Sequence, residues 1–274
     1  MTNSISQDLT AEEKSRPYSK YFYRDMAQPD PELMKIANGP PMDPSDALPI
    51  HRINDLLDPG YHKVETGYCI MPDGSGYACV NTKMPGVTFD MLNWWMSWFP
   101  LESLRYKMWY KKEHVAHYVA PESYAQAAST KLSSIEKFHG ATHIAIEDIG
   151  AGKTAELHIT FMSPEEAGFD VARFTGANKG IIATNTRVMD KVGGTTPMAR
   201  VTMIHFIREI LGGIELRTRF WMGYSIVDKK PVCMLPPGVQ IPLQLPRGAV
   251  EHSVCEFSNL RSFLPELYAE ESNR

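Results

Sequence analysis

Residues 199–227 read ARVTMIHFIREIL, then Gly212-Gly213, then IELRTRFWMGYSIV, and this stretch decides the fold. Both runs are rich in β-branched and aromatic residues, which is typical of β-strands. The two glycines between them accept the positive φ that a tight turn requires. The stretch therefore predicts a long β-hairpin and, with it, an antiparallel sheet.

Two further segments carry strand patterns. Residues 67–84 read GYCIMPDGSGYACVNTKM, in which two short apolar runs flank a Pro-Asp-Gly-Ser-Gly turn, and they predict a second hairpin. Residues 156–162 alternate apolar side chains at 157, 159 and 161 with polar ones between them, which is the period-2 pattern of a half-buried strand. The middle of the chain is therefore expected to be rich in strands.

The C-terminal segment predicts the longest helix. Between 250 and 268 the apolar residues recur at steps of three and four and form one stripe, which consists of Val250, Val254, Phe257, Leu260, Leu264 and Leu267. A shorter apolar helix is predicted from Phe89 to Phe99, and its three tryptophans favour a place in the core or at a subunit interface. An antiparallel sheet with a long C-terminal helix laid on it indicates an α+β fold of the helix-grip kind, where sheet and helix enclose a cavity.

The first 60 residues differ in character from the rest. They are rich in Pro, Asp and Met, with PDPE and GPPMDPSDALP among them. Such punctuation predicts an extended arm that lies over the body or over a neighbouring subunit, without a core of its own.

Composition and charge exclude several classes of protein. The chain has 274 residues with 28 Lys and Arg against 32 Asp and Glu, a net charge of −4, whereas nucleic-acid binding requires a basic stripe. The polar N-terminus carries no secretory signal, and no apolar run is long enough to span a membrane. The four cysteines contain no CxxC pair, which favours a cytoplasmic protein with reduced thiols.

Metal binding is the chemistry that the histidines suggest. His252 and Glu256 lie four residues apart on the predicted C-terminal helix, so both side chains can reach one point and chelate a metal. The same spacing is also common on solvated helix faces. His114 and His117 follow an aromatic segment, and in an extended strand they would point in different directions, so at most one is expected to join a given metal.

Other donors leave the set of ligands open. His139 and His143 flank Gly140-Ala141, Glu147-Asp148 ends an apolar run, and His205 lies inside the long hairpin. Two histidines with two carboxylates suit zinc, but spacing alone does not select which four. Competing chemistries fit poorly, because the sequence has no GxSxG nucleophile elbow and no glycine-rich nucleotide loop in a strand–helix context.

Four sequence blocks, taken in order, carry a family resemblance. They are LRYKMWYKKEH (104–114), THIAIEDIG (142–150), IELRTRFWMGY (214–224) and EHSVCEF (251–257), and together they resemble the 2,4-diacetylphloroglucinol hydrolase family. The resemblance implies hydrolysis of the C–C bond between a polyhydroxylated aromatic ring and its acyl group, on a phenolic ketone of the phloretin or acetylphloroglucinol type. It also implies a Bet v 1-like (START-like) helix-grip domain over 86–274, preceded by an arm and hairpin over 1–85 that serve in dimerisation.

The resemblance also selects site residues. It implies one Zn²⁺ per subunit, with metal ligands at His114, Glu147, His252 and Glu256. Substrate binding falls on Tyr106, His117 and Tyr224, and catalysis on His205, Tyr106 and Tyr224. His117 stands where some family members are expected to carry an amide side chain, which affects the contacts to the ring hydroxyls. The expected partners are a small phenolic ketone and further copies of the chain, in a homodimer or a higher homo-oligomer, without nucleic acid or membrane.

Two rival functions remain open on the sequence. A helix-grip carrier would bind an apolar aromatic ligand without turning it over, and it would need no cluster of histidines and glutamates. A cyclase on the same fold would give a ring-closed isomer in place of an acid and a phenol. Metal content separates the first rival from a hydrolase, and product analysis separates the second.

Overall fold

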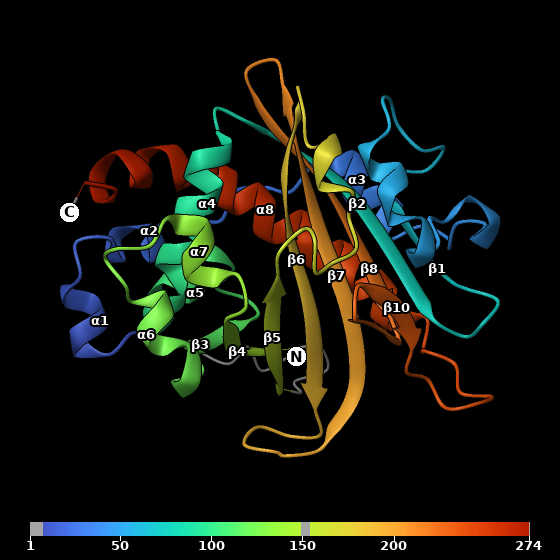
Figure 1. Ribbon diagram of the computed structural model, residues 1–274. Coiled ribbons are helices and arrows are strands. Elements are labelled where there is room, and N and C mark those ends of the chain that lie inside the picture. The colour runs from blue at the N-terminus through green and yellow to red at the C-terminus, as the bar shows by residue number, and fades with distance from the viewer. Residues whose placement is uncertain (1–7, 149–153, 274) are drawn as a thin grey trace.

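The computed structural model describes residues 8–148 and 154–273, and its centre is one large, curved antiparallel sheet (Figure 1). The strand order is β1-β2-β8-β7-β6-β5-β4-β3, so β1 and β3 form the two edges. The strands of this sheet are β1 (Gly67–Ile70), β2 (Gly76–Pro85), β3 (His114–Val119), β4 (Thr142–Asp148), β5 (Thr154–Met162), β6 (Asn178–Met189), β7 (Pro197–Ile210) and β8 (Gly213–Met222).

The long hairpin predicted from residues 199–227 is confirmed in β7 and β8. Ile210 pairs with Gly213 across a two-residue turn, in which Gly212 takes a φ of +80°. The second strand is shorter than predicted, because Gly223, with a φ of +101°, ends it after Met222. The chain continues as β9 (Tyr224–Val227), which pairs with β10 (Lys230–Cys233) in a separate two-stranded sheet.

The second predicted hairpin is β1 and β2, and it belongs to the same sheet. β2 pairs with β8 along all ten of its residues, from Gly76 opposite Met222 to Pro85 opposite Gly213. The domain boundary expected between 85 and 86 therefore falls at the end of β2. The β1–β2 hairpin lies before this boundary, yet β2 is hydrogen-bonded to β8, which lies after it. Residues 1–7 of the expected N-terminal region lie outside the described residues.

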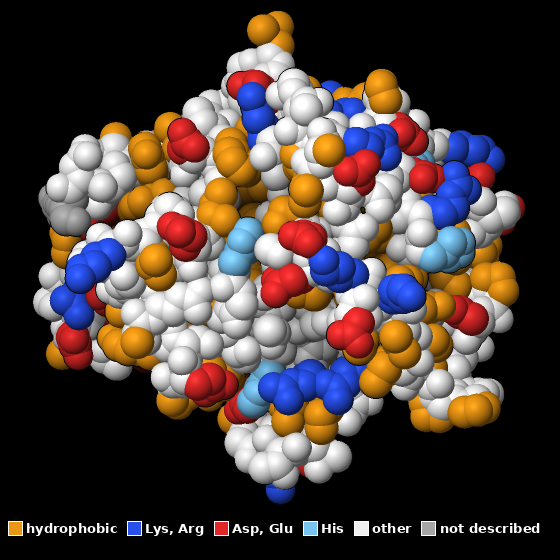
Figure 2. Space-filling model, viewed as in Figure 1, with side chains coloured by type: hydrophobic (Ala, Val, Ile, Leu, Met, Phe, Trp, Pro, Cys, Tyr) orange, Lys and Arg blue, Asp and Glu red, His pale blue; other side chains and the backbone are white. Residues whose placement is uncertain are grey.

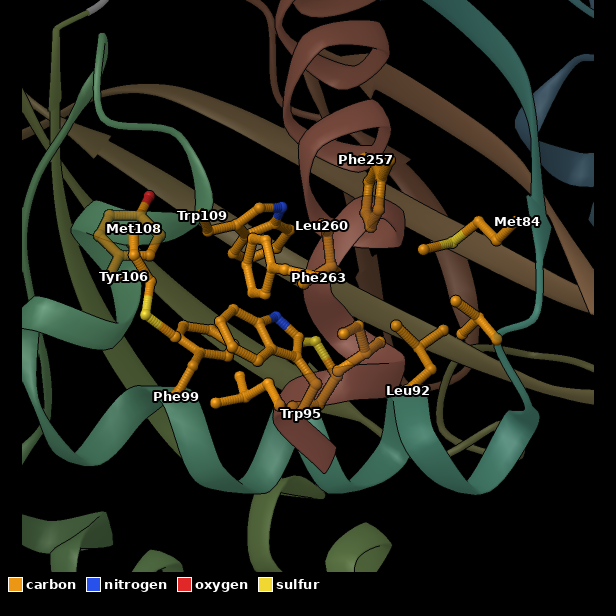
Figure 3. Close-up of a cluster of buried hydrophobic side chains, with 14 of the residues drawn as sticks. Met84, Leu92, Trp95, Phe99, Tyr106, Met108, Trp109, Phe257, Leu260 and Phe263 are labelled. Carbon is orange, nitrogen blue, oxygen red and sulfur yellow. The ribbon is translucent and has the colours of Figure 1, made fainter. Parts of the chain in front are cut away.

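Helix α8 (Gln244–Glu271) lies across one face of the sheet, as the C-terminal segment predicts. It is longer than predicted at both ends. The stripe from Phe257 onward packs with α4 (Phe89–Trp98), whose Trp95 is fully buried, and this shared core is drawn in Figure 3. Val250 and Val254, at the start of the stripe, pack against β1 and β2. Asn259 also holds α8 in place, since its side-chain amide donates to the carbonyls of Met108 and Trp109.

The other helices are short and flank this core. They are α1 (Ala11–Ser15), α2 (Ser19–Tyr23), α3 (Pro31–Ala37), α5 (Ser103–Trp109), α6 (Tyr124–Ala127) and α7 (Ser134–Phe138), with 3₁₀ turns at Pro44–Asp46, Ile50–Leu57, Phe99–Leu101, Pro121–Ser123 and Val171–Arg173. Within the described ranges, no helix combines the length and the apolarity needed to cross a bilayer. Acidic and basic side chains are interspersed on the face shown in Figure 2.

The later part of the N-terminal arm, from 42 to 57, covers the opposite face of the sheet, whereas Tyr18 and Tyr21 of its earlier part pack into the core on the α8 side. The turn Ile50–Leu57 packs Ile53 and Leu56 into a second cluster with Phe206 and Trp221, which belong to β7 and β8. Side chains alternate between faces along a strand, so His205 and Ile207 point toward α8 while Ile204 and Phe206 point toward the arm. The sheet therefore has two buried faces, and each is lined by its own set of polar residues.

Candidate metal centre

Three side chains from two distant segments meet at the edge of the sheet below α8. His114 begins β3, and His252 and Glu256 lie one turn apart on α8. The two Nε2 atoms are 3.4 Å apart, and Glu256 Oε2 lies 3.8 Å from His114 Nε2 and 3.6 Å from His252 Nε2. Within the described part of the chain, this is the one group of three or more His, Cys, Asp or Glu side chains whose ligand atoms lie within 4.8 Å of one another.

Both imidazoles are oriented by a hydrogen bond on the nitrogen that faces away from the shared point. His114 Nδ1–H donates to the backbone carbonyl of Tyr106 at 3.0 Å. His252 Nδ1–H donates to Glu113 Oε2 at 2.6 Å, and Glu113 also accepts the hydroxyl of Tyr110 at 3.1 Å. Such bonds occupy Nδ1 and leave Nε2 as the nitrogen that faces the shared point, which is the arrangement found in metal-binding histidines.

Sequence reasoning missed the role of Glu113. The residue directly precedes His114 and lies three positions after Tyr110, yet its partner is His252, which is 139 residues away. The signal available in the sequence was a carboxylate next to a candidate ligand on an aromatic segment. Only the fold shows which imidazole it supports.

Burial and charge shift the pKa values of all three members. Burial lowers the pKa of His114 well below its usual value, and the nearby His252 lowers it further. Burial also raises the pKa of Glu256. The pKa of His252 is raised well above its usual value, since the carboxylates of Glu256 and Glu113 outweigh the opposing effect of burial. A buried group that combines two imidazoles with nearby carboxylates has the donor types and the charge that suit a divalent cation.

Glu147, the fourth predicted ligand, lies on the neighbouring strand. It pairs with His114 in the β3–β4 register, and its carboxylate accepts a hydrogen bond from the hydroxyl of Tyr106. Its charge acts on His252 and Glu256, which places it beside the cluster. The structure thus brings three predicted ligands into one group and holds Glu147 next to them through Tyr106.

Tyr106 connects the candidate metal ligands His114, His252 and Glu256, called the metal cluster below, to their surroundings. It belongs to α5, and its ring stacks on the His114 ring with centroids 3.7 Å apart and planes 3° apart. Burial raises its pKa well above the usual value, and the charge of Glu147 adds to this effect. Figure 3 shows Trp109 between Tyr106 and the α8 side chains, and the centroid of its ring is 6.2 Å from that of Tyr106 and 5.5 Å from that of Phe257. Trp109 fastens the same turn of α8, because its Nε1–H donates to the carbonyl of Glu256 at 3.1 Å.

The expectation that His114 and His117 point in different directions is wrong. His114 pairs with Glu147 and His117 with Ala145, while the register shifts between His114 and Ala116, which marks a β-bulge. Because of the extra residue, His114 and His117 are three positions apart on β3 but pair with residues that are two positions apart on β4. Both imidazoles therefore point to the same face, and both are buried. His117 lies with its ring centroid 4.9 Å from that of Tyr106, and it joins the group as a neighbour of the metal cluster.

The two remaining candidates lie in different places. His205, on β7, packs 5.0 Å from the ring of Phe257 and forms a 2.7 Å hydrogen bond between its Nδ1 and Thr218 Oγ1. Burial lowers its pKa to about 3, so this imidazole is neutral at pH 7. Tyr224 is not brought to the group: its ring packs against the cluster on the arm-covered face, and its hydroxyl donates to Asp73 at 2.5 Å.

Comparison with known proteins gives a consistent result. A family model described as the DAPG hydrolase PhiG domain matches residues 48–269. A phloretin hydrolase from Eubacterium ramulus is 32% identical over 279 residues, which cover 99% of this chain and 96% of that protein. Two 2,4-diacetylphloroglucinol hydrolases, from a Pseudomonas species and from Pseudomonas protegens, are each 31% identical over 275 residues, which cover 94% of this chain and 89% and 85% of theirs.

Proposed function

The chain belongs to the DAPG hydrolase family, and from that premise we propose that it hydrolyses the C–C bond between a polyhydroxylated aromatic ring and its acyl group. The substrate is a small phenolic ketone of the phloretin or acetylphloroglucinol type, and the products are a phloroglucinol-type phenol and a carboxylic acid. The observation that carries the proposal is the convergence of His114, His252 and Glu256 on one point.

We propose one Zn²⁺ per subunit as the cofactor, held by His114, His252, Glu256 and Glu147. The fit rests on the two Nε2 atoms, each freed for a ligand by the hydrogen bond on its own Nδ1, and on the carboxylate between them. Two nitrogen and two oxygen donors match the ligand types that zinc takes in proteins. When bound, the ion supplies a Lewis acid that polarises the ketone oxygen and acidifies water.

Tyr106 acts in this proposal as a proton-bearing hydrogen-bond donor. Its raised pKa keeps the hydroxyl protonated at neutral pH, and the hydroxyl lies beside the cluster in contact with Glu147. A carbonyl or phenol oxygen of the substrate could accept this proton in place of Glu147. Stacking on His114 fixes the ring, so the hydroxyl is held in one orientation.

The difficult step is departure of the ring carbon. Once water has added to the ketone carbon, the C–C bond breaks with its electron pair left on the ring, and that carbon must take up a proton. Hydroxyls ortho and para to the acyl group assist, because the ring can pass through a keto tautomer when its carbon is protonated. His205 is neutral at pH 7 and lies below α8, so we assign it hydrogen bonding and proton relay in its uncharged form.

Tyr224 is supported by the resemblance alone, and a single variant tests it. If Tyr224 binds substrate, Tyr224→Phe lowers kcat/KM. If its hydroxyl serves only the bond to Asp73, the variant keeps its kinetics and loses a little stability.

The experiment that tests the function is incubation of the purified protein with phloretin and with mono- and diacetylphloroglucinol, with both products followed by chromatography and zinc measured on the same sample. We expect cleavage to phenol and acid with one zinc per chain. His252→Ala should lose both zinc and turnover, whereas the control Glu251→Gln, an exposed carboxylate on the same helix, should keep both. Metal-loaded protein that binds these ketones without cleaving any of them would contradict the proposal and favour a carrier.

Three further assignments are part of the proposal. The long helix laid over a curved antiparallel sheet supports a Bet v 1-like domain over 86–274, with β1 and β2 of the preceding region completing its sheet. The arm and hairpin over 1–85 are our proposed dimerisation region. The four cysteines are free, which supports a cytoplasmic location.

A further inference from the structure

Next to the metal cluster, two buried imidazoles lie against each other. His143 on β4 and His117 on β3 have ring centroids 5.2 Å apart, and Phe99 and Phe161 pack around them. The exposed fraction of His143 is 1% and that of His117 is 2%. Neither nitrogen of His143 has a hydrogen-bond partner within the described residues, and neither has Nδ1 of His117.

These three unpaired atoms are unusual for this molecule. Most buried polar groups in a folded protein are paired, since an unpaired one loses its bonds to water without compensation. The other buried unpaired atoms of the described residues come one from each side chain, whereas His143 has two. Three such atoms in one place can form hydrogen bonds with a partner that binds there.

The protonation state of the pair restricts the chemistry of such a partner. Burial lowers the pKa of His117 to about 3 and that of His143 well below its usual value. Both rings are therefore neutral at pH 7, and the neutral ring of His143 presents one N–H and one lone pair. An anion would pair only with the N–H and a cation only with the lone pair, whereas a hydroxyl group can pair with both.

The position of the pair relates it to the reaction. His143 and Glu147 are four residues apart on β4 and so point to the same face, while His117 and His114 share that face through the bulge. Tyr106 contacts both groups, since its ring stacks on His114 and its centroid lies 4.9 Å from that of His117. A substrate with its ketone at the metal cluster would extend its ring past Tyr106 toward His117 and His143.

We propose that His143, together with His117, binds a hydroxyl group of the substrate's aromatic ring and is a specificity-determining residue for polyhydroxylated rings. The inference rests on the proposed function for the identity of the ligand. It assigns no metal to the pair, because within the described residues the one group that suits a metal is His114, His252 and Glu256.

The test compares His143→Leu with His143→Gln, which keeps a donor and an acceptor. His139→Leu serves as the control, since His139 is a half-buried histidine four residues away. For each protein, kcat and KM are measured with 2,4,6-trihydroxyacetophenone and with its 2,4- and 2,6-dihydroxy analogues. His143→Leu should lower kcat/KM for the trihydroxy ketone by about tenfold or more, but should leave kcat/KM for one of the two dihydroxy analogues almost unchanged. That analogue is the one that lacks the hydroxyl bound by His143. His143→Gln should recover part of the difference, and His139→Leu should match the wild type.

Two further readouts separate specificity from structure. His143→Leu should keep its zinc and should melt at an equal or higher temperature than the wild type, because an unpaired polar ring leaves the core. A uniform loss of kcat/KM on all three ketones, or no loss on any, would overturn the proposal. If His143→Leu does not fold, the same comparison is decided by His143→Gln, which should show a smaller shift in the same direction.

Binding of phloroglucinol, followed by calorimetry, keeps this inference distinct from the proposed function. If the wild type cleaves none of the ketones, the proposed function fails, and binding decides the role of His143. Weaker binding by His143→Leu than by His139→Leu would support the subsite, and equal binding by both variants would refute it.

Discussion

The two faces of the sheet bury polar groups in opposite ways. On the arm-covered face, Glu65 accepts hydrogen bonds from Arg217 at 2.7 and 3.1 Å and from Arg219 at 2.6 Å, and both arginines are almost fully buried. On the α8 face, His143 and His117 are just as buried and leave three nitrogens unpaired. The paired charges hold the segment before β1 to the sheet, whereas the unpaired neutral rings lie next to the candidate metal ligands and form the ligand site that we propose. Arg219 Nε is also unpaired, but its guanidinium is held by Glu65, whereas the ring of His143 has no hydrogen bond within the described residues.

Among the variants that test this difference between the two faces, the replacement of His114 should have the largest effect. His114→Ala removes a donor from the metal cluster, and we expect kcat to fall by at least about a thousandfold, or about 4 kcal/mol of activation free energy. Zinc content should fall with it, and the zinc-free variant should melt close to the zinc-free wild type. His158→Ala is the matched control, because His158 bonds Glu156 on β5, away from the cluster. A His114→Ala protein that keeps its zinc and its turnover would remove the cluster from the mechanism.

The arm-covered face should respond in stability alone. Glu65→Gln leaves two buried guanidinium groups without their counter-charge, and we expect a loss of about 3–5 kcal/mol in the free energy of unfolding by urea titration. The turnover of the folded fraction should not change. The control is Glu209→Gln, whose ion pair with Lys179 lies at the surface and is worth about 1 kcal/mol or less. Equal losses in the two variants would show that the buried cluster is not what attaches the arm.

Low pH should weaken the ion pairs that Glu65 forms with Arg217 and Arg219. Arg217 and Arg219 lower the pKa of Glu65 from 4.5 to about 2, although burial opposes them. Because the folded pKa lies below the unfolded one, this stabilisation is present above pH 4.5 and is lost as the pH falls from 4.5 toward 2. The loss is up to about 3 kcal/mol at 1.36 kcal/mol per pKa unit. Unfolding free energies measured across that range should fall less steeply in Glu65→Gln, and parallel curves would contradict this.

The smallest expected effect concerns Glu113, which touches a proposed ligand without being one. Glu113→Gln weakens the hydrogen bond that orients His252, and zinc affinity should fall by about 10- to 100-fold. Competition with a chelator measures this change. Kinetics at saturating zinc should then be close to wild type, as should both measurements in the control Glu122→Gln, an exposed carboxylate. An unchanged zinc affinity in Glu113→Gln would leave Glu113 with no positioning role.

Local patterns in the sequence predict much of this fold. The hairpins at 67–84 and 199–227 and the helix at 250–268 all form, because each depends on periodicity and on turn glycines that act over a few residues. The early end of β8 at Gly223 was not foreseen, since the following residues continue the apolar pattern. Within the site, the pair of His252 and Glu256 could be read from helical spacing, but their meeting with His114 depends on strand order across the whole sheet.

The histidines on β3 and β4 show where local reasoning stops. His117 was expected to point away from His114, because the bulge that turns it inward depends on pairing with β4. The proposed role of His143 was not foreseen either, as a histidine near Gly140 carries no pattern that distinguishes it. Its unpaired nitrogens become visible only once every neighbour is in place.

The bulge in β3 has a consequence for recognising such sites in other chains. His114 and His117 share a face because β3 carries one extra residue, Val115, between His114 and Ala116, whose partners Glu147 and Ile146 are adjacent on β4. A chain without that residue would bring the same two imidazoles to the same face from positions i and i+2 of a regular strand. Deleting Val115 should therefore leave both rings facing inward. The same arrangement of two imidazoles can therefore be encoded as His-x-His in a regular strand or as His-x-x-His in a bulged one. When two such sequences are aligned, a one-residue gap must be placed at the bulge for the histidines to match.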